Sequence, residues 1–260
     1  MYSVLMNKGG CGKTSLITNL ASALSSENEN VKVLIIDMDP QGNAALTFGL
    51  TPNDIEYTMY QVLTGEDDIS EITIQVENNL YIAPSNSEMD FLEFEVLPNI
   101  EKYKNPFLLL KEKLDAIKND YDYIFIDTPP SLGLIAGNVL AVTDEIIIPF
   151  VPDSFGVHGF IRVVQALQDF KEDQGIDVNV IGVVSMLVDN RTKLHQDMIA
   201  DAKEYCKNNN IRMFKTAIPR SIRFAASVGY DRKPAVLSSE RSNPIVKSYI
   251  ELMKELLENE

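Results

Sequence analysis

The chain has 260 residues and carries 23 Lys and Arg against 38 Asp and Glu, so its formal net charge is −15. Two cysteines are too few for a disulfide-stapled scaffold, no apolar run approaches the ~20 residues that span a bilayer, and no signal-peptide pattern opens the chain. We therefore expect a globular cytoplasmic protein. Taken alone, its acidity argues against nucleic acid as a partner, because phosphates repel an acidic surface.

Short apolar strands alternate with helical segments along the chain. Apolar, β-branched runs predict strands at residues 2–6, 31–36, 80–83, 123–126, 145–150, 178–185 and 211–218. Helical patterns lie at residues 13–26, 106–118, 132–142, 158–171, 192–208 and 244–258. This alternation predicts a single α/β domain over residues 1–260, with a mostly parallel sheet and helices on both faces. Residues 47–101 are more polar and less regular, and we expect them to be an embellishment on that domain.

The first predicted strand leads into a glycine-rich loop that opens a helix. The loop departs from the pattern G-x-x-x-x-G-K-[ST], because Asn7 replaces its first glycine and an extra lysine, Lys8, follows. Three glycines still allow backbone N–H groups to surround phosphate oxygens, next to the positive end of a helix. We expect Lys13 to reach the β- and γ-phosphates of a nucleotide, and the Thr14 hydroxyl to complete a Mg²⁺ shell.

Carboxylates stand at the ends of two further strands. Asp37 and Asp39 end the second strand and begin a turn, and Asp127 does the same after residues 123–126. Ligands of open α/β sheets bind beyond the carboxyl ends of the strands, and strand-end carboxylates hold or orient Mg²⁺ in phosphoryl-transfer sites. The three strand ends together predict a nucleotide and magnesium site at one edge of the sheet.

These segments resemble the deviant Walker A ATPases of the ParA/MinD group, which have P-loop NTPase architecture, and most closely the ParA/Soj partitioning branch. The matching segments are K-G-G-C-G-K-T-S at 8–15, D-M-D-P-Q-G-N at 37–43, F-I-D-T-P-P at 125–130, D-N-R-T at 189–192 and I-P-R-S-I-R at 218–223. Only seven residues precede Lys8, so no N-terminal helix-turn-helix extension is expected.

The resemblance implies an ATP-dependent sandwich dimer that hydrolyses ATP slowly to ADP and phosphate with Mg²⁺. It implies that Lys8 reaches the nucleotide of the other subunit, Lys13 holds the phosphates and Asp39 positions the attacking water. Thr14 and Asp127 would organise Mg²⁺, with Asp37 as a supporting carboxylate. The other nucleotide contacts implied are Gly9, Gly10, Cys11, Gly12 and Ser15 in the loop, and Pro219 against the adenine.

Family resemblance also implies that the ATP-bound dimer binds double-stranded nucleoid DNA without sequence preference. Release would follow hydrolysis stimulated by a ParB-type centromere-binding protein with a basic N-terminal segment. Residues 211–247 carry eight Lys and Arg against two Asp and Glu, so a local basic surface exists in this acidic chain. The candidates for DNA contact are Arg191, Lys215, Arg220 and Arg223, followed by Arg241 and Lys247; the alternative is that these cations pair with carboxylates. Residues 33–101 hold 14 Asp and Glu and no Lys or Arg, and would attract a basic partner.

Two other readings compete with DNA partitioning. A MinD-like ATPase would position membrane or protein assemblies without binding DNA, and would end in a basic amphipathic helix. The last helix of this chain is amphipathic but acidic, so we expect it to dock on the core and expect no membrane partner. An iron–sulfur protein would need clustered cysteines, whereas Cys11 lies in the loop and Cys206 on an expected surface helix.

Overall fold

The computed structural model describes residues 1–153, 156–175 and 178–258. Its centre is an eight-stranded sheet of order β3-β4-β2-β5-β1-β6-β7-β8, in which every neighbouring pair is parallel except β3 and β4. The predicted fold, a mostly parallel sheet with helices on both faces, is confirmed. The strands are β1 Tyr2–Val4, β2 Val33–Asp37, β3 Ile74–Glu77, β4 Leu80–Ala83, β5 Tyr123–Asp127, β6 Glu145–Phe150, β7 Asn179–Val188 and β8 Met213–Pro219.

The edge strand β3 was not predicted. It runs antiparallel to β4 and is only half-buried. Its sequence, Ile-Gln-Val-Glu, alternates apolar and polar residues as a strand with one covered face does. Four residues are too short a run for that alternation to stand out within an acidic, irregular stretch.

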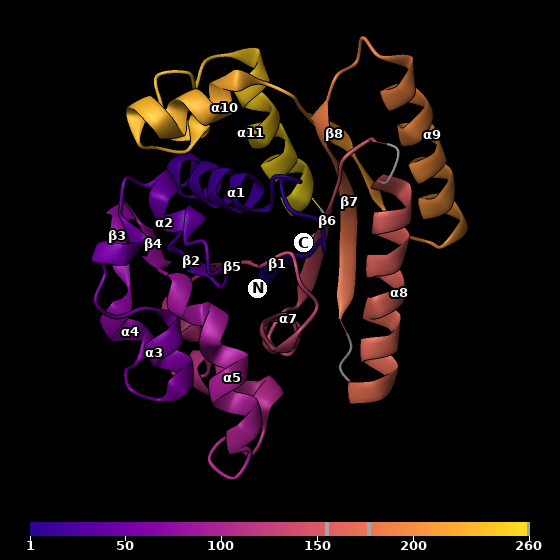
Figure 1. Cartoon of the computed structure of the whole chain (residues 1–260). Helices are drawn as coiled ribbons and strands as arrows, with labels where there is room; N and C mark the ends of the chain where they lie inside the picture. The colour runs from indigo at the N-terminus through magenta and orange to yellow at the C-terminus, as the bar shows by residue number, and fades with distance from the viewer. Residues whose placement is uncertain (154–155, 176–177, 259–260) are drawn as a thin grey trace.

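The helices form layers on the two faces of the sheet. Figure 1 shows α1, α10 and α11 on one side of β6, β7 and β8, and α8 and α9 on the other. The predicted helix at 106–118 is shorter in the structure, where 3₁₀ turns flank α6. The α-helices are α1 Lys13–Glu27, α2 Asn43–Thr47, α3 Met59–Thr64, α4 Ile69–Ile72, α5 Leu92–Val96, α6 Leu109–Leu114, α7 Leu134–Leu140, α8 Gly156–Gln174, α9 Lys193–Asn208, α10 Ile222–Ala226 and α11 Pro244–Leu257.

The continuous apolar strands are explained by a core on each face of the sheet. In β2, Ile35 joins one hydrophobic cluster with α1, whereas Leu34 and Ile36 join a second cluster with α3, α6 and α7. All three side chains are fully buried. Because successive side chains of a strand point to opposite faces, only a strand covered on both sides buries such a run. The two cores fix the position of the sheet. The carboxyl ends of its parallel strands all lie along the same side of it.

The C-terminal helix α11 docks on the core, as predicted. It packs against β8 and α1 and buries Tyr249, Leu252 and Leu256 on its inner face. The Tyr249 hydroxyl lies 2.8 Å from the Ser15 hydroxyl, so this helix also supports the glycine-rich loop where α1 begins. Within the described part of the chain, no helix is both long and apolar enough to cross a membrane.

Candidate functional site

The glycine-rich loop adopts backbone angles that require its glycines. Gly10 and Gly12 have φ of 70° and 89°, in the left-handed region that side chains disfavour. A Cβ on Gly12 would also lie 2.9 Å from the Met186 Cε atom. Gly12 immediately precedes α1, and its carbonyl accepts from Leu16 N at 2.8 Å. The free N–H groups at the start of α1 therefore adjoin the loop, as in anion-binding helix termini.

One cavity of about 270 Å³ brings the three strand ends together. Seven predicted nucleotide-binding residues of the loop, at 9–15, line it with Asp39. Gln41, Asn43 and Pro130 also line this cavity and were not predicted as site residues. Their signal was present, because all three lie inside the segments 37–43 and 125–130 that carry the family resemblance. The sheet edge thus brings together residues that are more than 100 positions apart in sequence.

Thr14, which lines this cavity, forms a direct contact with Asp127. The Thr14 hydroxyl donates to Asp127 Oδ2 at 2.5 Å, and Asp127 is fully buried. Burial raises the pKa of Asp127 to about 7, against the lowering effect of the Thr14 hydrogen bond. A buried carboxylate beside a hydroxyl is an oxygen donor set that a hard divalent cation stabilises. The residues present therefore fit a magnesium ion.

Asp37 has a different local role in the structure. Its two carboxylate oxygens accept from the backbone N–H groups of Asp39 and Ala44, each at 3.0 Å. Burial, and then the negative charge of Asp127, raise the pKa of Asp37 well above its usual value. These bonds hold the turn that carries Asp39 and the start of α2. Its supporting role toward Mg²⁺ stays a prediction.

Asp39 and Lys13 both line the loop cavity. Asp39 lines the cavity, and its Oδ1 accepts from Gln41 N at 3.0 Å. Burial raises the pKa of Asp39, while the Gln41 hydrogen bond and the Lys13 charge lower it. The Lys13 ammonium is buried and lies 3.5 Å from the Lys8 carbonyl oxygen. An acidic and a basic group thus line the same cavity.

The extra lysine of the loop is held by a residue that was not predicted. Lys8 Nζ forms an ion pair with Asp153, which follows β6. The side chains of Lys8 and Asp153 are 35% and 40% exposed, so the pair is accessible to water. Asp153 lies three residues beyond the end of β6 and in none of the segments that carry the family resemblance, so no local pattern marked it. Neither Lys8 nor Pro219 is among the residues that line the loop cavity in this structure.

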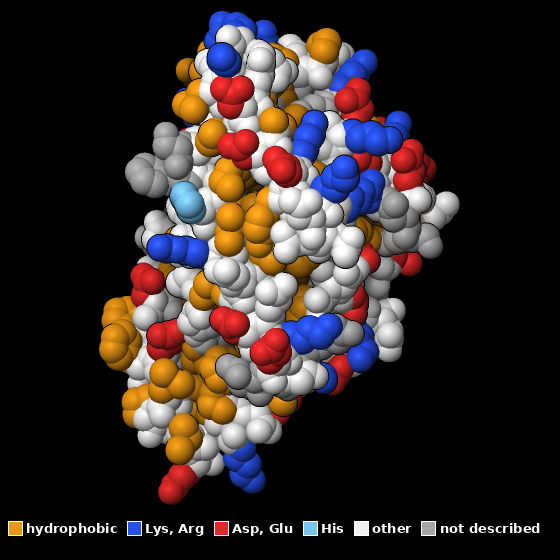
Figure 2. Space-filling model, turned by 90° about the vertical axis from the view of Figure 1, so that its right-hand side faces the viewer, with side chains coloured by type: hydrophobic (Ala, Val, Ile, Leu, Met, Phe, Trp, Pro, Cys, Tyr) orange, Lys and Arg blue, Asp and Glu red, His pale blue; other side chains and the backbone are white. Residues whose placement is uncertain are grey.

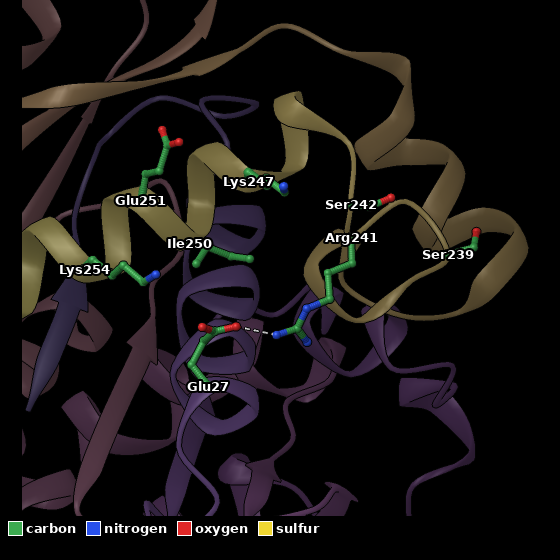
Figure 3. A pocket seen from close by; sticks show the side chains of 8 residues that line it. All are labelled: Glu27, Ser239, Arg241, Ser242, Lys247, Ile250, Glu251 and Lys254. Atoms are coloured by element: carbon green, nitrogen blue, oxygen red, sulfur yellow. Dashed lines mark hydrogen bonds and ion pairs between the residues drawn. The ribbon is translucent and has the colours of Figure 1, made fainter.

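A larger cavity, of about 580 Å³, lies between the end of α1 and α11. Figure 3 shows Arg241 reaching Glu27 across it, with Lys247, Glu251 and Lys254 on α11. It contains no residue of the glycine-rich loop and no strand end, so it is separate from the nucleotide site. Arg241, which was a candidate for DNA contact after the first four, therefore forms an ion pair with Glu27.

The basic candidates fall into paired and unpaired groups. Arg191 makes two hydrogen bonds to Asp189, and Arg223 bonds Glu240. Among the described residues no ion pair is formed by Lys215 or Arg220, and both side chains are exposed. Arg220 N donates to Val188 O at 2.9 Å, so the ends of β7 and β8 bring Arg191 and Arg220 close together. Lys215 lies four residues before Pro219 on β8, about 13 Å along the strand.

Both cysteines are buried. Cys206 is 1% exposed because it lies on the inner face of the surface helix α9. Cys11 is equally buried, and burial raises the pKa of both thiols. In the described ranges, no group of three or more His, Cys, Asp or Glu side chains is arranged to hold a metal ion.

Comparison with known proteins decides the family. The AAA_31 family, described as an AAA domain, matches residues 1–180. The sporulation initiation inhibitor protein Soj of Bacillus subtilis is 31% identical over 260 residues, covering 100% of this chain and 98% of that protein. The chain belongs to the ParA/Soj family. The chromosome partitioning protein ParA of Myxococcus xanthus, 29% identical, covers 97% of this chain and 86% of its own length.

Solved structures show that the ParA/Soj family shares its fold with other enzymes. Cobyrinic acid a,c-diamide synthase from Mycobacterium smegmatis, with bound ATP analog and magnesium, superposes with a TM-score of 0.84. The two proteins are 23% identical, and the match covers 99% of this chain and 94% of that one. Because a fold hosts several chemistries, this likeness establishes architecture, and function has to be argued from the site.

Proposed function

We propose that this chain is a DNA-partitioning ATPase that binds ATP with Mg²⁺ and hydrolyses it slowly. The observation that supports this most strongly is the single cavity shared by the glycine-rich loop and Asp39, which is also lined by Thr14, the hydrogen-bond partner of Asp127. A phosphate cradle, a magnesium-type donor set and a carboxylate for the attacking water are the parts that phosphoryl transfer needs. The relatives named for chromosome partitioning support the biological role.

In the proposed reaction the protein acts by positioning and by charge. The loop amides and Lys13 hold the phosphates of ATP, and Asp39 orients the attacking water toward the terminal phosphorus. Thr14 and Asp127 would hold Mg²⁺, which supplies positive charge to the phosphate oxygens when bound. The new P–O bond forms as the bond to ADP breaks, giving ADP and phosphate. Positioning and electrostatic stabilisation account for most catalysis of this kind.

Mg²⁺ and ATP together should raise the thermal stability of this chain. Binding to the folded state alone stabilises by about 2.7 kcal/mol at a ligand concentration 100 times Kd, and Mg²⁺ would also offset the charge of buried Asp127. Differential scanning fluorimetry should show the largest rise in Tm with ATP and Mg²⁺, a smaller one with ATP and EDTA, and a reduced one for Thr14→Ala. An equal shift with and without Mg²⁺ would contradict the assignment of Thr14 and Asp127.

We further propose that ATP binding forms a homodimer that contacts nucleoid DNA through the basic end of β7 and β8. Lys215 and Arg220 are the first candidates for DNA contact, because they are exposed and make no ion pair among the described residues. Arg191 and Arg223 would exchange their carboxylate partners for phosphate, a small cost for exposed ion pairs. A dimer doubles this surface, while the acidic remainder of the chain limits contact to it.

DNA binding should depend on nucleotide and fall steeply with salt. Each neutralised phosphate releases counterions, so Arg220→Ala or Lys215→Ala should reduce the slope of log K against log[salt] by about 1 per subunit. Fluorescence anisotropy with ATP, ADP and no nucleotide at two salt concentrations measures this. Lys118→Ala is the control, since Lys118 precedes β5 at the amino ends of the strands, away from the ends of β7 and β8, and pairs with Asp115. DNA affinity that did not change with salt concentration, or the absence of DNA binding with ATP, would refute the proposal.

A MinD-like membrane role is the second candidate function. It would need a free amphipathic terminal helix, whereas α11 buries its apolar face against β8 and α1. Co-sedimentation with vesicles of anionic phospholipid in the presence of ATP distinguishes the two: we expect DNA and not vesicles to retain the protein. In the proposed cycle, a ParB-type partner stimulates hydrolysis and releases the dimer from the nucleoid.

A further inference from the structure

The helical segment around α5 is apolar on two opposite faces. Its inner face buries Met89, Leu92 and Val96, each at most 1% exposed. Its outer face carries Phe91, Phe94, Leu97 and Ile100, which are between 49% and 77% exposed. The spacing of three residues places these four side chains along one stripe of the helical run. We refer to Phe91, Phe94, Leu97 and Ile100 as the apolar ridge.

The apolar ridge is an unusual surface for a protein of this size. Exposed large apolar side chains are normally scattered, and a contiguous group of them marks an interaction site. Figure 2 shows hydrophobic side chains gathered at the lower end of the molecule, the end at which Figure 1 places α5. Leu132, which is 43% exposed, follows β5 and lies two residues before Leu134, whose N–H donates to Glu93 on α5. The ridge therefore adjoins the segment that leaves the magnesium-type site.

Carboxylates outnumber cations around the apolar ridge, where Lys102 forms an ion pair with Glu95. Five carboxylates accompany it in sequence, and no Lys or Arg occurs between residues 33 and 101; the five are Glu88, Asp90, Glu93, Glu95 and Glu101. A twofold interface places a surface against its own copy, so two such ridges would face each other with ten carboxylates. A second copy of this chain is therefore disfavoured as the occupant. A segment with apolar side chains on one face and Lys or Arg on the other matches both the ridge and its rim.

A direct contact connects the ridge segment to the candidate catalytic site. Glu93 Oε1 accepts from Leu134 N at 2.8 Å, where α7 begins. A Cβ on Gly133 would lie 2.3 Å from the same Glu93 oxygen, so a larger residue there would displace the Glu93 carboxylate from this contact. Residues 128–133 connect Asp127 to the hydrogen bond between Glu93 and Leu134. A molecule that binds α5 could therefore shift the loop between Asp127 and α7 through Glu93.

We propose that the apolar ridge docks a basic amphipathic helix of the partner protein that stimulates hydrolysis. The proposal rests on the proposed function, and it assigns that partner a place on α5. The anchor side chains are Phe91 and Phe94, which the partner's apolar residues would cover. The carboxylates of the rim would pair with the partner's cations and set the orientation of the helix.

The test measures ATP hydrolysis with DNA while the ParB-type protein encoded in the same genome is titrated in. The double variant Phe91→Ser/Phe94→Ser should need about tenfold to thirtyfold more partner for half-maximal stimulation, as for loss of aromatic hot spots. Its unstimulated hydrolysis and ATP-dependent dimer should match wild type. Tyr57→Ser is the matched control, because Tyr57 is an exposed aromatic residue, 46% exposed, of the same acidic region but outside the ridge. Phe91→Leu/Phe94→Leu should restore stimulation.

A second arm tests the rim with a synthetic peptide of the partner's basic N-terminal segment. Its affinity, measured by fluorescence anisotropy, should fall several-fold with Glu101→Lys and should weaken with added salt. Wild-type stimulation of the Phe91→Ser/Phe94→Ser variant would overturn the docking site and leave the proposed function standing. Loss of its ATP-dependent dimer in analytical ultracentrifugation would instead assign the ridge to the dimer interface and also overturn the proposal. If the wild-type chain bound no DNA with ATP, the proposed function itself would fail.

Discussion

Asp39→Ala should bind ATP and Mg²⁺ normally and lose hydrolysis, by about 10²- to 10⁴-fold in kcat. Asp39 lines the cavity with the glycine-rich loop, and its own Oδ1 is oriented by Gln41 N at 3.0 Å. No loop contact to phosphate depends on this carboxylate, so nucleotide affinity should be kept. Single-turnover hydrolysis of labelled ATP, alongside equilibrium binding of a fluorescent ATP analogue, separates the two effects.

Asp39→Asn is the informative companion variant. Its amide oxygen retains the acceptor for Gln41 N, but it has no negative charge with which to orient or deprotonate water. It should therefore be as slow as Asp39→Ala. If Asp39→Asn hydrolysed ATP at the wild-type rate, Asp39 would serve only to shape the turn, and another group would have to position the water.

Lys8→Ala should abolish the ATP-dependent dimer and, with it, ATP-dependent DNA binding. In the single chain Lys8 pairs with Asp153 and is not among the residues that line the cavity of its own loop. An exposed ion pair is worth only about 0–1 kcal/mol, so Lys8 is free to exchange Asp153 for a phosphate of the facing subunit. Charge delivered across a subunit interface accelerates phosphoryl transfer by about 10³- to 10⁵-fold in related systems, so hydrolysis should collapse too.

Light scattering with ATP, with Asp39→Ala as the background that retains ATP, measures the dimer directly. Asp153→Ala is the matched control, because it removes the same ion pair and leaves Lys8 in place. We expect Asp153→Ala to dimerise as wild type does. A dimer that persisted in Lys8→Ala would exclude the reach of Lys8 across the interface. Equal loss in both variants would show that the ion pair itself maintains the loop.

Much of the fold was predictable because its signals are local. Val and Ile runs such as residues 33–36 specify strands covered on both faces, and the step from strand to Gly-Lys-Thr to helix specifies a phosphate loop. The strand β3 was missed because four alternating residues carry little local signal. The helix at 106–118 was overextended because periodicity does not reveal where 3₁₀ turns interrupt it.

The candidate site was partly predictable for a related reason. Asp39 and the loop residues were identified because parallel strands bring their carboxyl ends to one edge. The partners of Lys8 and of Leu134 N were not, since Asp153 and Glu93 belong to no motif and meet their partners only after folding. The surface position of α9 was predicted, but the burial of Cys206 was not, because it depends on the rotation of the helix against the sheet.

The net charge of −15 illustrates the same division. The fold class, the phosphate loop, the strand-end carboxylates and the uneven distribution of charge could be read from the sequence, because each depends on residues close together in the chain. The folded chain shows which cations are paired, that Lys8 is held by Asp153, and that an apolar ridge faces outward amid carboxylates. Those features depend on contacts between distant segments, such as the 145 positions separating Lys8 from Asp153, and only the packing of helices on the sheet sets them.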